Sequence, residues 1–168
     1  MSIPREGMSA TEIASALTGM RRQDPPVHGG QVLAYVYDAG VSSAATAGLE
    51  ALSAFAEVNA LDPTTFPSVA RIENDLVGWG LDLLRAPEDA AGVLTSGGTE
   101  SCILAVLASR ERWRRRGGTG TPVLIAADTV HPAFHKAAHL LGLDVRTVPV
   151  DRQSLRLTAE AVRKALDA

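Results

Sequence analysis

Cysteine, lysine and long apolar runs are all scarce in this chain of 168 residues. Because Cys102 is the single cysteine, a disulfide within the chain is excluded, which favours a reducing compartment. No segment approaches the roughly 20 consecutive apolar residues that a membrane-spanning helix needs. The first residues also lack the basic start and apolar core of a signal peptide. We therefore expect a cytoplasmic protein without a membrane span.

Lysine occurs only as Lys136 and Lys164, although the chain has 16 basic residues. A mechanism that needs a lysine amine must therefore use one of these two. The formal net charge of −3 argues against a nucleic-acid-binding surface. Five arginines nevertheless gather between residues 110 and 116, near the end of a predicted helix. We interpret them as favourable charge at a helix C-terminus, in preference to an anion or partner site.

Turn residues and apolar periodicity predict helices first, then alternating strands and helices. Ser9 and Glu12 have the spacing of a capping box, which predicts a helix that fades by Arg21. Helices are also predicted over 43–59, 68–84, 99–116, 132–141 and from Thr158 onward. The helix over 68–84 carries an apolar stripe of Val69, Ile72, Leu76, Trp79 and Leu83. Strands are predicted over 92–95, 122–126 and 144–148.

This alternation predicts an α/β fold with a mainly parallel sheet. Residues 1–88 are expected to form an amino-terminal helical arm, and residues 89–168 the first part of the α/β domain. Three strands are few for such a domain, so we expect the sheet to be incomplete and the domain truncated.

The segment Thr95–Ser101 lies between a predicted strand and a predicted helix, where open α/β sheets place their ligands. Gly97 and Gly98 would let a phosphate approach the backbone, and the helix N-terminus offers N–H groups. The hydroxyls of Ser96, Thr99 and Ser101 could add donors. The segment matches neither a Walker loop nor a dinucleotide fingerprint. A plain glycine turn stays an equally good interpretation of the pattern alone.

His131 follows the next strand, so it is expected to face the same crevice. Its imidazole could stack on an aromatic ligand or donate a hydrogen bond, although the pattern alone favours a solvent-facing histidine before a helix that starts with proline. His131, His135 and His139 are spaced by four and could share one helix face. We favour exposed helix residues over a metal site, because no Glu or Cys joins them nearby.

Three separated motifs resemble one known family. They are TSGGTES, then HPAFHKAAHLLGLDVRTVPVD one strand later, and an upstream Asn59–Pro63 segment followed by Phe66–Val69. Over residues 32–151 the chain is similar to pyridoxal-phosphate-dependent group II decarboxylases, most of all to the sphingosine-1-phosphate lyase branch. It departs from the family pattern at His135, where an acidic residue is common, and at Ala60, which replaces a proline.

The resemblance implies the first part of a fold type I, aspartate-aminotransferase-like large domain that binds pyridoxal 5′-phosphate. Gly98 and Thr99 would hold the cofactor phosphate, and Ser96 and Gly97 would shape the loop. His131 would stack on the pyridine ring. Tyr35, Tyr37 and Asn59 would lie in the arm that lines the substrate side of the site.

The family's Schiff-base lysine and its pyridine-binding acid both follow the stacking histidine on later strands. Neither Lys136, Lys164 nor Asp128 stands in that position. The resemblance implies a lyase that cleaves a carbon–carbon bond of a phosphorylated amino-alcohol, working as a homodimer on a small amine or amino acid. The alternatives are an amino-acid decarboxylase and a non-catalytic fragment that associates with another chain.

Overall fold

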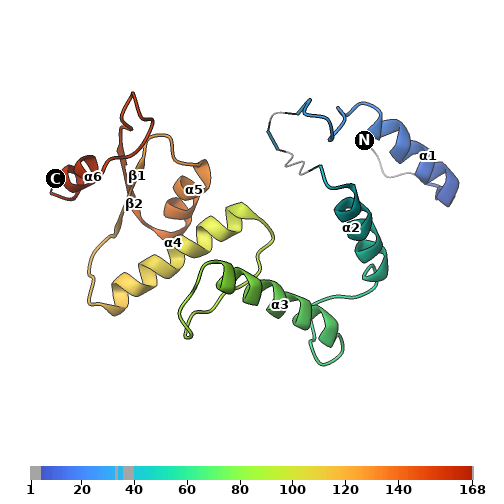
Figure 1. Cartoon of the computed structure of the whole chain (residues 1–168), viewed down its shortest axis with the longest axis horizontal. Coiled ribbons are helices and arrows are strands. Elements are labelled where there is room, and N and C mark those ends of the chain that lie inside the picture. The colour runs from blue at the N-terminus through green and yellow to red at the C-terminus, as the bar shows by residue number, and fades with distance from the viewer. Residues whose placement is uncertain (1–4, 33, 36–39, 168) are drawn as a thin grey trace. The chain divides into compact units, whose positions relative to one another are not determined.

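The computed structural model describes residues 5–32, 34–35 and 40–167 (Figure 1). Its elements are α1 (Ala10–Arg21), α2 (Ser42–Ala54), α3 (Pro67–Leu83), α4 (Gly98–Arg115), β1 (Val123–Ala127), α5 (Pro132–Leu141), β2 (Asp144–Val148) and α6 (Ala159–Leu166). Within the described ranges, no helix is both long and apolar enough to cross a membrane.

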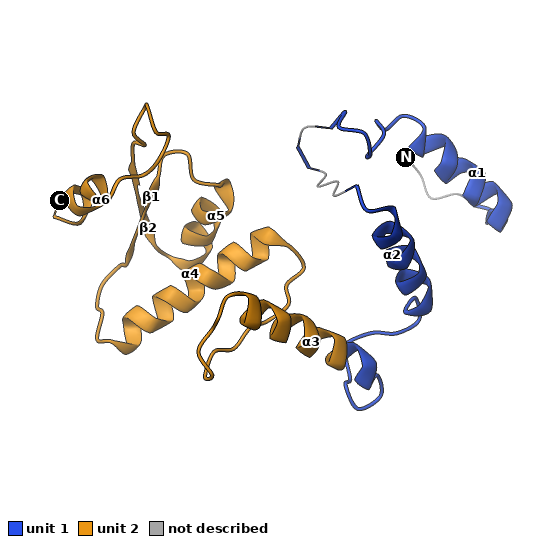
Figure 2. Ribbon diagram, in the orientation of Figure 1, with its two compact units in different colours: residues 1–69 blue, residues 70–168 orange. Residues whose placement is uncertain are grey.

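The chain divides into two compact units, residues 1–69 and residues 70–168 (Figure 2). In the first unit α1 begins with the predicted capping box. The Ser9 amide donates to Glu12 Oε2 at 2.7 Å, and the Glu12 amide donates to Ser9 Oγ at 3.3 Å.

The predicted domain boundary after residue 88 stays a prediction, since a division by compactness does not locate the start of a functional domain.

The second unit contains a β–α–β arrangement. β1 and β2 pair in parallel, with Val123 opposite Asp144 and Ala127 opposite Val148. The connecting helix α5 begins at Pro132, as predicted, and stops at Gly142, whose φ of 70° is left-handed backbone that glycine adopts readily. Figure 1 shows α5 lying between the sheet and α4, and it contacts both.

Small side chains make the core of this unit. Ala137 and Ala138 on α5 are completely buried, and Ala133 on the same helix is also buried. The remaining buried apolar residues are Val106 on α4, Ala126 on β1 and Val148 on β2. Because alanine has no side chain beyond Cβ, the backbone of α5 can approach its neighbours closely.

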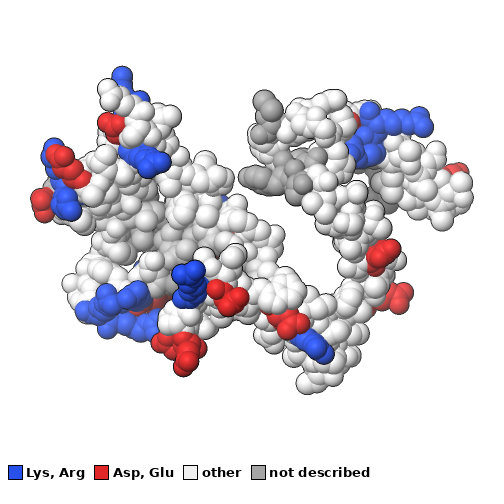
Figure 3. Space-filling view, viewed as in Figure 1, with Lys and Arg blue, Asp and Glu red and all other residues white. Residues whose placement is uncertain are grey.

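One of the clustered arginines joins α4 to α5. Arg110 extends from α4 and donates from NH1 to the carbonyl of Leu141, the last residue of α5, at 2.8 Å. A cation at a helix C-terminus meets both an unsatisfied carbonyl and the negative end of the helix dipole. Figure 3 shows basic side chains around the carboxyl end of α4, and Glu111 pairs there with Arg110 and Arg114. The predicted charge at the end of its own helix is found for Arg112, Arg114 and Arg115, which lie in the last turn of α4. Arg110 differs from the prediction, because it caps α5 instead.

Residues 92–95 are not a strand, contrary to the prediction. Among the described residues the sheet has two strands, β1 and β2. An apolar extended segment becomes a strand only when a neighbouring backbone accepts and donates its hydrogen bonds, and within the described ranges no backbone hydrogen bond is made by residues 92–95.

The apolar stripe predicted for α3 is largely exposed in the described structure. Trp79 is 69% exposed and Leu83 is 83% exposed, and Ile72 and Leu76 are also exposed. Val77, on another side of the helix, is half-buried and lies against Gly92. The helix therefore packs through a different face from the one that the stripe suggested.

Candidate functional site

The glycine loop forms the amino terminus of α4. Gly97 is the N-cap residue, with φ 158° and ψ 174°, a backbone conformation that is essentially restricted to glycine. A Cβ placed on Gly97 or Gly98 would meet nothing within 4 Å, so the space above both residues is open. Gly97 is thus required for its backbone conformation, and the open space leaves room for a ligand to reach the helix N-terminus.

Side chains of the loop hold it in this shape. Thr95 Oγ1 and Ser101 Oγ lie 2.7 Å apart, so one of these two hydroxyls donates to the other. The hydroxyl that accepts keeps its own proton for the Gly97 carbonyl, which lies 3.2 Å from Thr95 Oγ1 and 3.4 Å from Ser101 Oγ. Three groups are thereby fastened around the N-cap residue before any ligand is present.

Glu100 makes the strongest contact within the loop. Its Oε2 accepts from the Ser96 amide at 2.7 Å and from the Ser96 hydroxyl at 2.6 Å. These two bonds, the hydroxyl bond first, lower the pKa of the Glu100 carboxyl below its ordinary value. The carboxylate is therefore retained to a lower pH than that of an ordinary glutamate. Sequence reasoning missed this residue, although Ser96 and Glu100 stand one helical turn apart.

The donors that remain at this helix end include the amides of Gly98, Thr99 and Glu100 and the Thr99 hydroxyl. The first N–H groups of a helix have no acceptor within the helix, and Ser101 is the first residue whose amide bonds back, to Gly97. In the described chain the Thr99 hydroxyl makes no recorded hydrogen bond, and the residue is exposed. Three backbone N–H groups, one hydroxyl and the positive end of the helix dipole can together bind an anion such as phosphate.

His131 is the N-cap residue of α5. Its Nδ1 accepts a hydrogen bond from the Ala133 amide at 3.1 Å. In the neutral imidazole the proton therefore sits on Nε2, and the bond at Nδ1 fixes the ring's orientation. The side chain is exposed, so a ring face can meet a planar ligand. The described structure records no hydrogen bond between His131 and the glycine loop, so their joint use stays a prediction.

Asp128 fastens the carboxyl ends of the two strands together. Its amide donates to the Val148 carbonyl at 2.9 Å, and its Oδ1 accepts from the Val150 amide at 3.2 Å. The segment that carries His131 starts at this residue. Sequence reasoning could not find this role, because the partner is 22 positions away and belongs to a different strand end.

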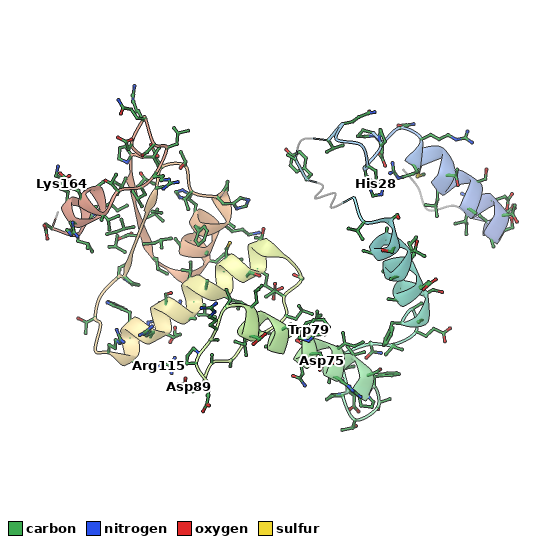
Figure 4. All side chains as sticks on the ribbon, viewed as in Figure 1. His28, Asp75, Trp79, Asp89, Arg115 and Lys164 are labelled. Carbon is green, nitrogen blue, oxygen red and sulfur yellow. The ribbon has the colours of Figure 1, made fainter. Side chains whose placement is uncertain are left out.

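Neither lysine directly follows a strand, although Lys164 lines a shallow hollow with Val148 and Pro149 at the end of β2. Lys136 is exposed on α5. Lys164 lies on α6 (Figure 4), where its amine is 2.9 Å from Glu160. Hydrogen bonding to Glu160, aided by its charge, raises the pKa of Lys164. The protonated amine is thus favoured further, which makes it a poor nucleophile.

Among the described residues, no group of three or more His, Cys, Asp or Glu side chains could hold a metal ion.

The predicted substrate-side residues are exposed or fall outside the described ranges. Tyr35 is 97% exposed and has a φ of 71°, and Tyr37 lies outside the described residues. Asn59 is exposed, and its Oδ1 accepts from the Leu61 amide at 3.0 Å in a local turn. Both described residues belong to the first unit.

An apolar hollow of about 280 Å³ lies between α4, β1 and α5, away from these groups. Its lining includes Trp113, Phe134 and the residues Pro122–Leu124 at the amino end of β1. Ligands of parallel sheets bind at the carboxyl ends of the strands, so this hollow is not the candidate site.

Comparison with known proteins identifies the fold. Residues 25–168 match the family described as the pyridoxal-dependent decarboxylase conserved domain. The solved structure of a sphingosine-1-phosphate lyase from Burkholderia pseudomallei superposes with a TM-score of 0.84 at 32% identity, covering 100% of this chain and 40% of that one.

Two curated proteins that are similar to this chain are named for different reactions, one as a lyase and one as a decarboxylase. Mouse sphingosine-1-phosphate lyase 1 is 28% identical over 165 residues, which is 98% of this chain and 28% of the relative. A probable L-tyrosine/L-aspartate decarboxylase from Methanothrix thermoacetophila is 35% identical over 170 residues, which is 99% of this chain and 40% of the relative. The chain thus spans well under half the length of either relative.

The Asp128 bridge predicts a local effect on β2. Asp128→Ala should speed hydrogen exchange of the Val150 amide by about fivefold to tenfold, because it removes an acceptor worth about 1 kcal/mol. Asp128→Asn keeps a side-chain oxygen and should preserve most of the protection. Exchange monitored by NMR measures both, with Asp144→Ala at the other end of β2 as control. Equal exchange rates in the Ala and Asn variants would contradict the bridge.

Proposed function

Because this chain belongs to the pyridoxal-dependent decarboxylase family, we propose that it is the amino-terminal part of a pyridoxal 5′-phosphate-dependent lyase. The observation that carries the proposal is the open helix N-terminus at Gly97–Thr99, which suits a phosphate, in a chain whose residues 25–168 match that family. The cofactor, when bound, supplies an electron sink for bond cleavage at an amine-bearing carbon.

The residues of this chain divide the work of binding. Gly98 and Thr99 hold the phosphate through backbone N–H groups and the Thr99 hydroxyl. Gly97 supplies the backbone turn, and Ser96 shapes the loop. His131 presents its ring for stacking, held by the Ala133 amide, with its proton at Nε2. Asp128 keeps the His131 segment attached to the sheet.

The covalent lysine is proposed to come from outside this chain. Lys164 is stabilised in its charged form by Glu160. Lys136 lies in the middle of α5, away from the carboxyl ends of the strands where the other proposed groups stand. The chain then provides the phosphate and ring-stacking sites, and the remainder of the enzyme provides the group that reacts with the cofactor.

For the full-length enzyme we favour carbon–carbon cleavage of a phosphorylated amino-alcohol. Support comes from the Asn59–Pro63 and Phe66–Val69 segments and from the Burkholderia pseudomallei lyase structure. Amino-acid decarboxylation is the second candidate, supported by the 35% identity to the Methanothrix thermoacetophila decarboxylase. Tyr35, Tyr37 and Asn59 are proposed to line the substrate side in either case.

We further propose that the full-length enzyme is a homodimer that works on a small-molecule amine or amino acid in the cytoplasm. The exposed α3 stripe around Trp79 supports the dimer, because a large aromatic in a row of apolar side chains is typical of an interface. A non-catalytic role for the short chain, as an association partner, uses the same exposed stripe.

The phosphate site predicts selective loss of cofactor binding. Thr99→Val removes the hydroxyl with little change in shape and should weaken binding of pyridoxal 5′-phosphate by about tenfold. Thr119→Val changes an exposed threonine outside the site and should have no effect. Fluorescence titration measures both affinities.

A second experiment tests the origin of the covalent lysine. Borohydride reduction at limiting cofactor, followed by peptide mapping, should give no stoichiometric adduct at Lys136 or Lys164. Such an adduct would refute the proposed division between this chain and the rest of the enzyme.

The proposed reaction predicts that a phosphorylated amino-alcohol is consumed much faster than an amino acid. The full-length enzyme loaded with cofactor should convert a phosphorylated long-chain amino-alcohol to an aldehyde. With tyrosine, aspartate or glutamate, release of carbon dioxide should be at least about a hundredfold slower, since a site built for one polar group rejects analogues that leave its own groups unpaired. Mass spectrometry and carbon dioxide release measure the two reactions. Faster decarboxylation would establish the second candidate instead.

The proposed dimer predicts that Trp79 contributes more to self-association than Asp75, which lies on the same helix. Trp79→Ser should weaken self-association of the full-length protein by at least about tenfold, since interface tryptophans commonly contribute 2 kcal/mol or more. Asp75→Ser, on the same helix (Figure 4), should leave association unchanged. Sedimentation velocity over a range of concentrations measures both. A protein that stays monomeric in its native form would rule out the dimer.

A further inference from the structure

The contact between Glu100 and Ser96 crosses the glycine loop. Glu100 is the third residue of α4, and its carboxylate reaches back past Gly97 to the residue that precedes the N-cap. One oxygen, Oε2, accepts both the amide and the hydroxyl of Ser96. Both bonds are short, and each joins a charged acceptor to a neutral donor, which is the stronger class of hydrogen bond.

This contact decides which donors of the loop remain for a ligand. Ser96 has one amide N–H and one hydroxyl proton, and Glu100 accepts both. Neither can therefore donate to a phosphate while the contact persists. The amides of Gly98, Thr99 and Glu100 and the Thr99 hydroxyl have no such competitor among the described residues.

A carboxylate beside a phosphate site also has an electrostatic cost, because like charges repel. The positive end of the α4 dipole offsets part of this cost, and salt screens exposed charges further. A carboxylate in this position must therefore bring a benefit that offsets the repulsion. The benefit is preorganisation, since a loop that is already in its bound shape loses less entropy when the ligand binds.

We propose that Glu100 is a positioning residue, which holds Ser96 back and fixes the loop so that the Gly98 and Thr99 donors are presented to the cofactor phosphate. The inference rests on the proposed phosphate site and adds to it the residue that selects among the loop's donors. Glu100 makes no contact with the phosphate in this scheme, and it acts only through Ser96 and the loop backbone.

The first test compares two variants that both lack the charge. Glu100→Gln keeps a side-chain oxygen that can accept from Ser96, whereas Glu100→Ala keeps none. We expect the full chain with Glu100→Ala to bind pyridoxal 5′-phosphate about tenfold more weakly than the chain with Glu100→Gln. Pyridoxal, which lacks the phosphate, should bind both variants equally. Glu160→Ala, which alters another exposed glutamate in the first turn of a helix, should match the native chain.

The second test needs no cofactor. In the native chain the Ser96 amide should be protected from hydrogen exchange, and its NMR shift should follow the ionisation of Glu100, whose pKa is lowered by this contact. Protection should persist in Glu100→Gln and disappear in Glu100→Ala.

The outcomes separate the two levels of the proposal. Equal affinity of the Gln and Ala variants for pyridoxal 5′-phosphate would overturn the role of Glu100 while leaving the phosphate site intact. A Ser96 amide that exchanges as fast in the native chain as in Glu100→Ala would overturn it whatever the cofactor does. A native chain that does not prefer pyridoxal 5′-phosphate over pyridoxal would refute the phosphate site, and the inference with it.

Discussion

The alanine face of α5 is the constraint on which the second unit depends. Ala137 and Ala138 are completely buried, so α5 lies close to both α4 and the sheet. The Arg110 guanidinium then reaches from α4 to the Leu141 carbonyl at the end of α5. A larger side chain at either alanine would push α5 away, and overpacking of this kind typically costs 1–3 kcal/mol. The glycine loop and His131 stand at the amino ends of these two helices, so their positions follow from this packing.

The loop and the histidine are held in the same way. In each, a hydrogen bond within the protein fixes a group that is not proposed to contact the ligand. Glu100 occupies the donors of Ser96, and the Ala133 amide occupies Nδ1 of His131. The groups that remain include the Gly98 and Thr99 donors and the exposed imidazole ring. A site assembled in this way is rigid before binding, which reduces the entropy lost on association.

Local signals in the sequence were enough for most of the helices. The capping box at Ser9 and Glu12, Pro132 and Gly142 placed helix ends correctly, because each acts through its immediate neighbours. The strand predicted over 92–95 was wrong, because pairing depends on a partner that an isolated apolar run does not reveal. The bridging role of Asp128 and the exposure of the predicted α3 stripe were missed for a related reason, since both are set by the tertiary fold. Glu100 could have been found from its spacing to Ser96, had the glycine between them been treated as a helix N-cap.

The named relatives with different activities match the same part of this chain, and the chemistry of the loop explains how that can be. In the proposed site, backbone N–H groups and one hydroxyl would bind a phosphate that belongs to the cofactor and not to the substrate, so the loop can stay unchanged while the reaction varies. The proposed stacking ring would likewise contact the cofactor. Choice between an amino-alcohol phosphate and an amino acid must then come from groups that reach the substrate. In this chain those groups are proposed to lie in the first unit, where Tyr35 and Asn59 are exposed and not committed to a core. Exchange of the segment 25–69 between a lyase and a decarboxylase of this family would therefore be expected to alter substrate preference more than cofactor affinity.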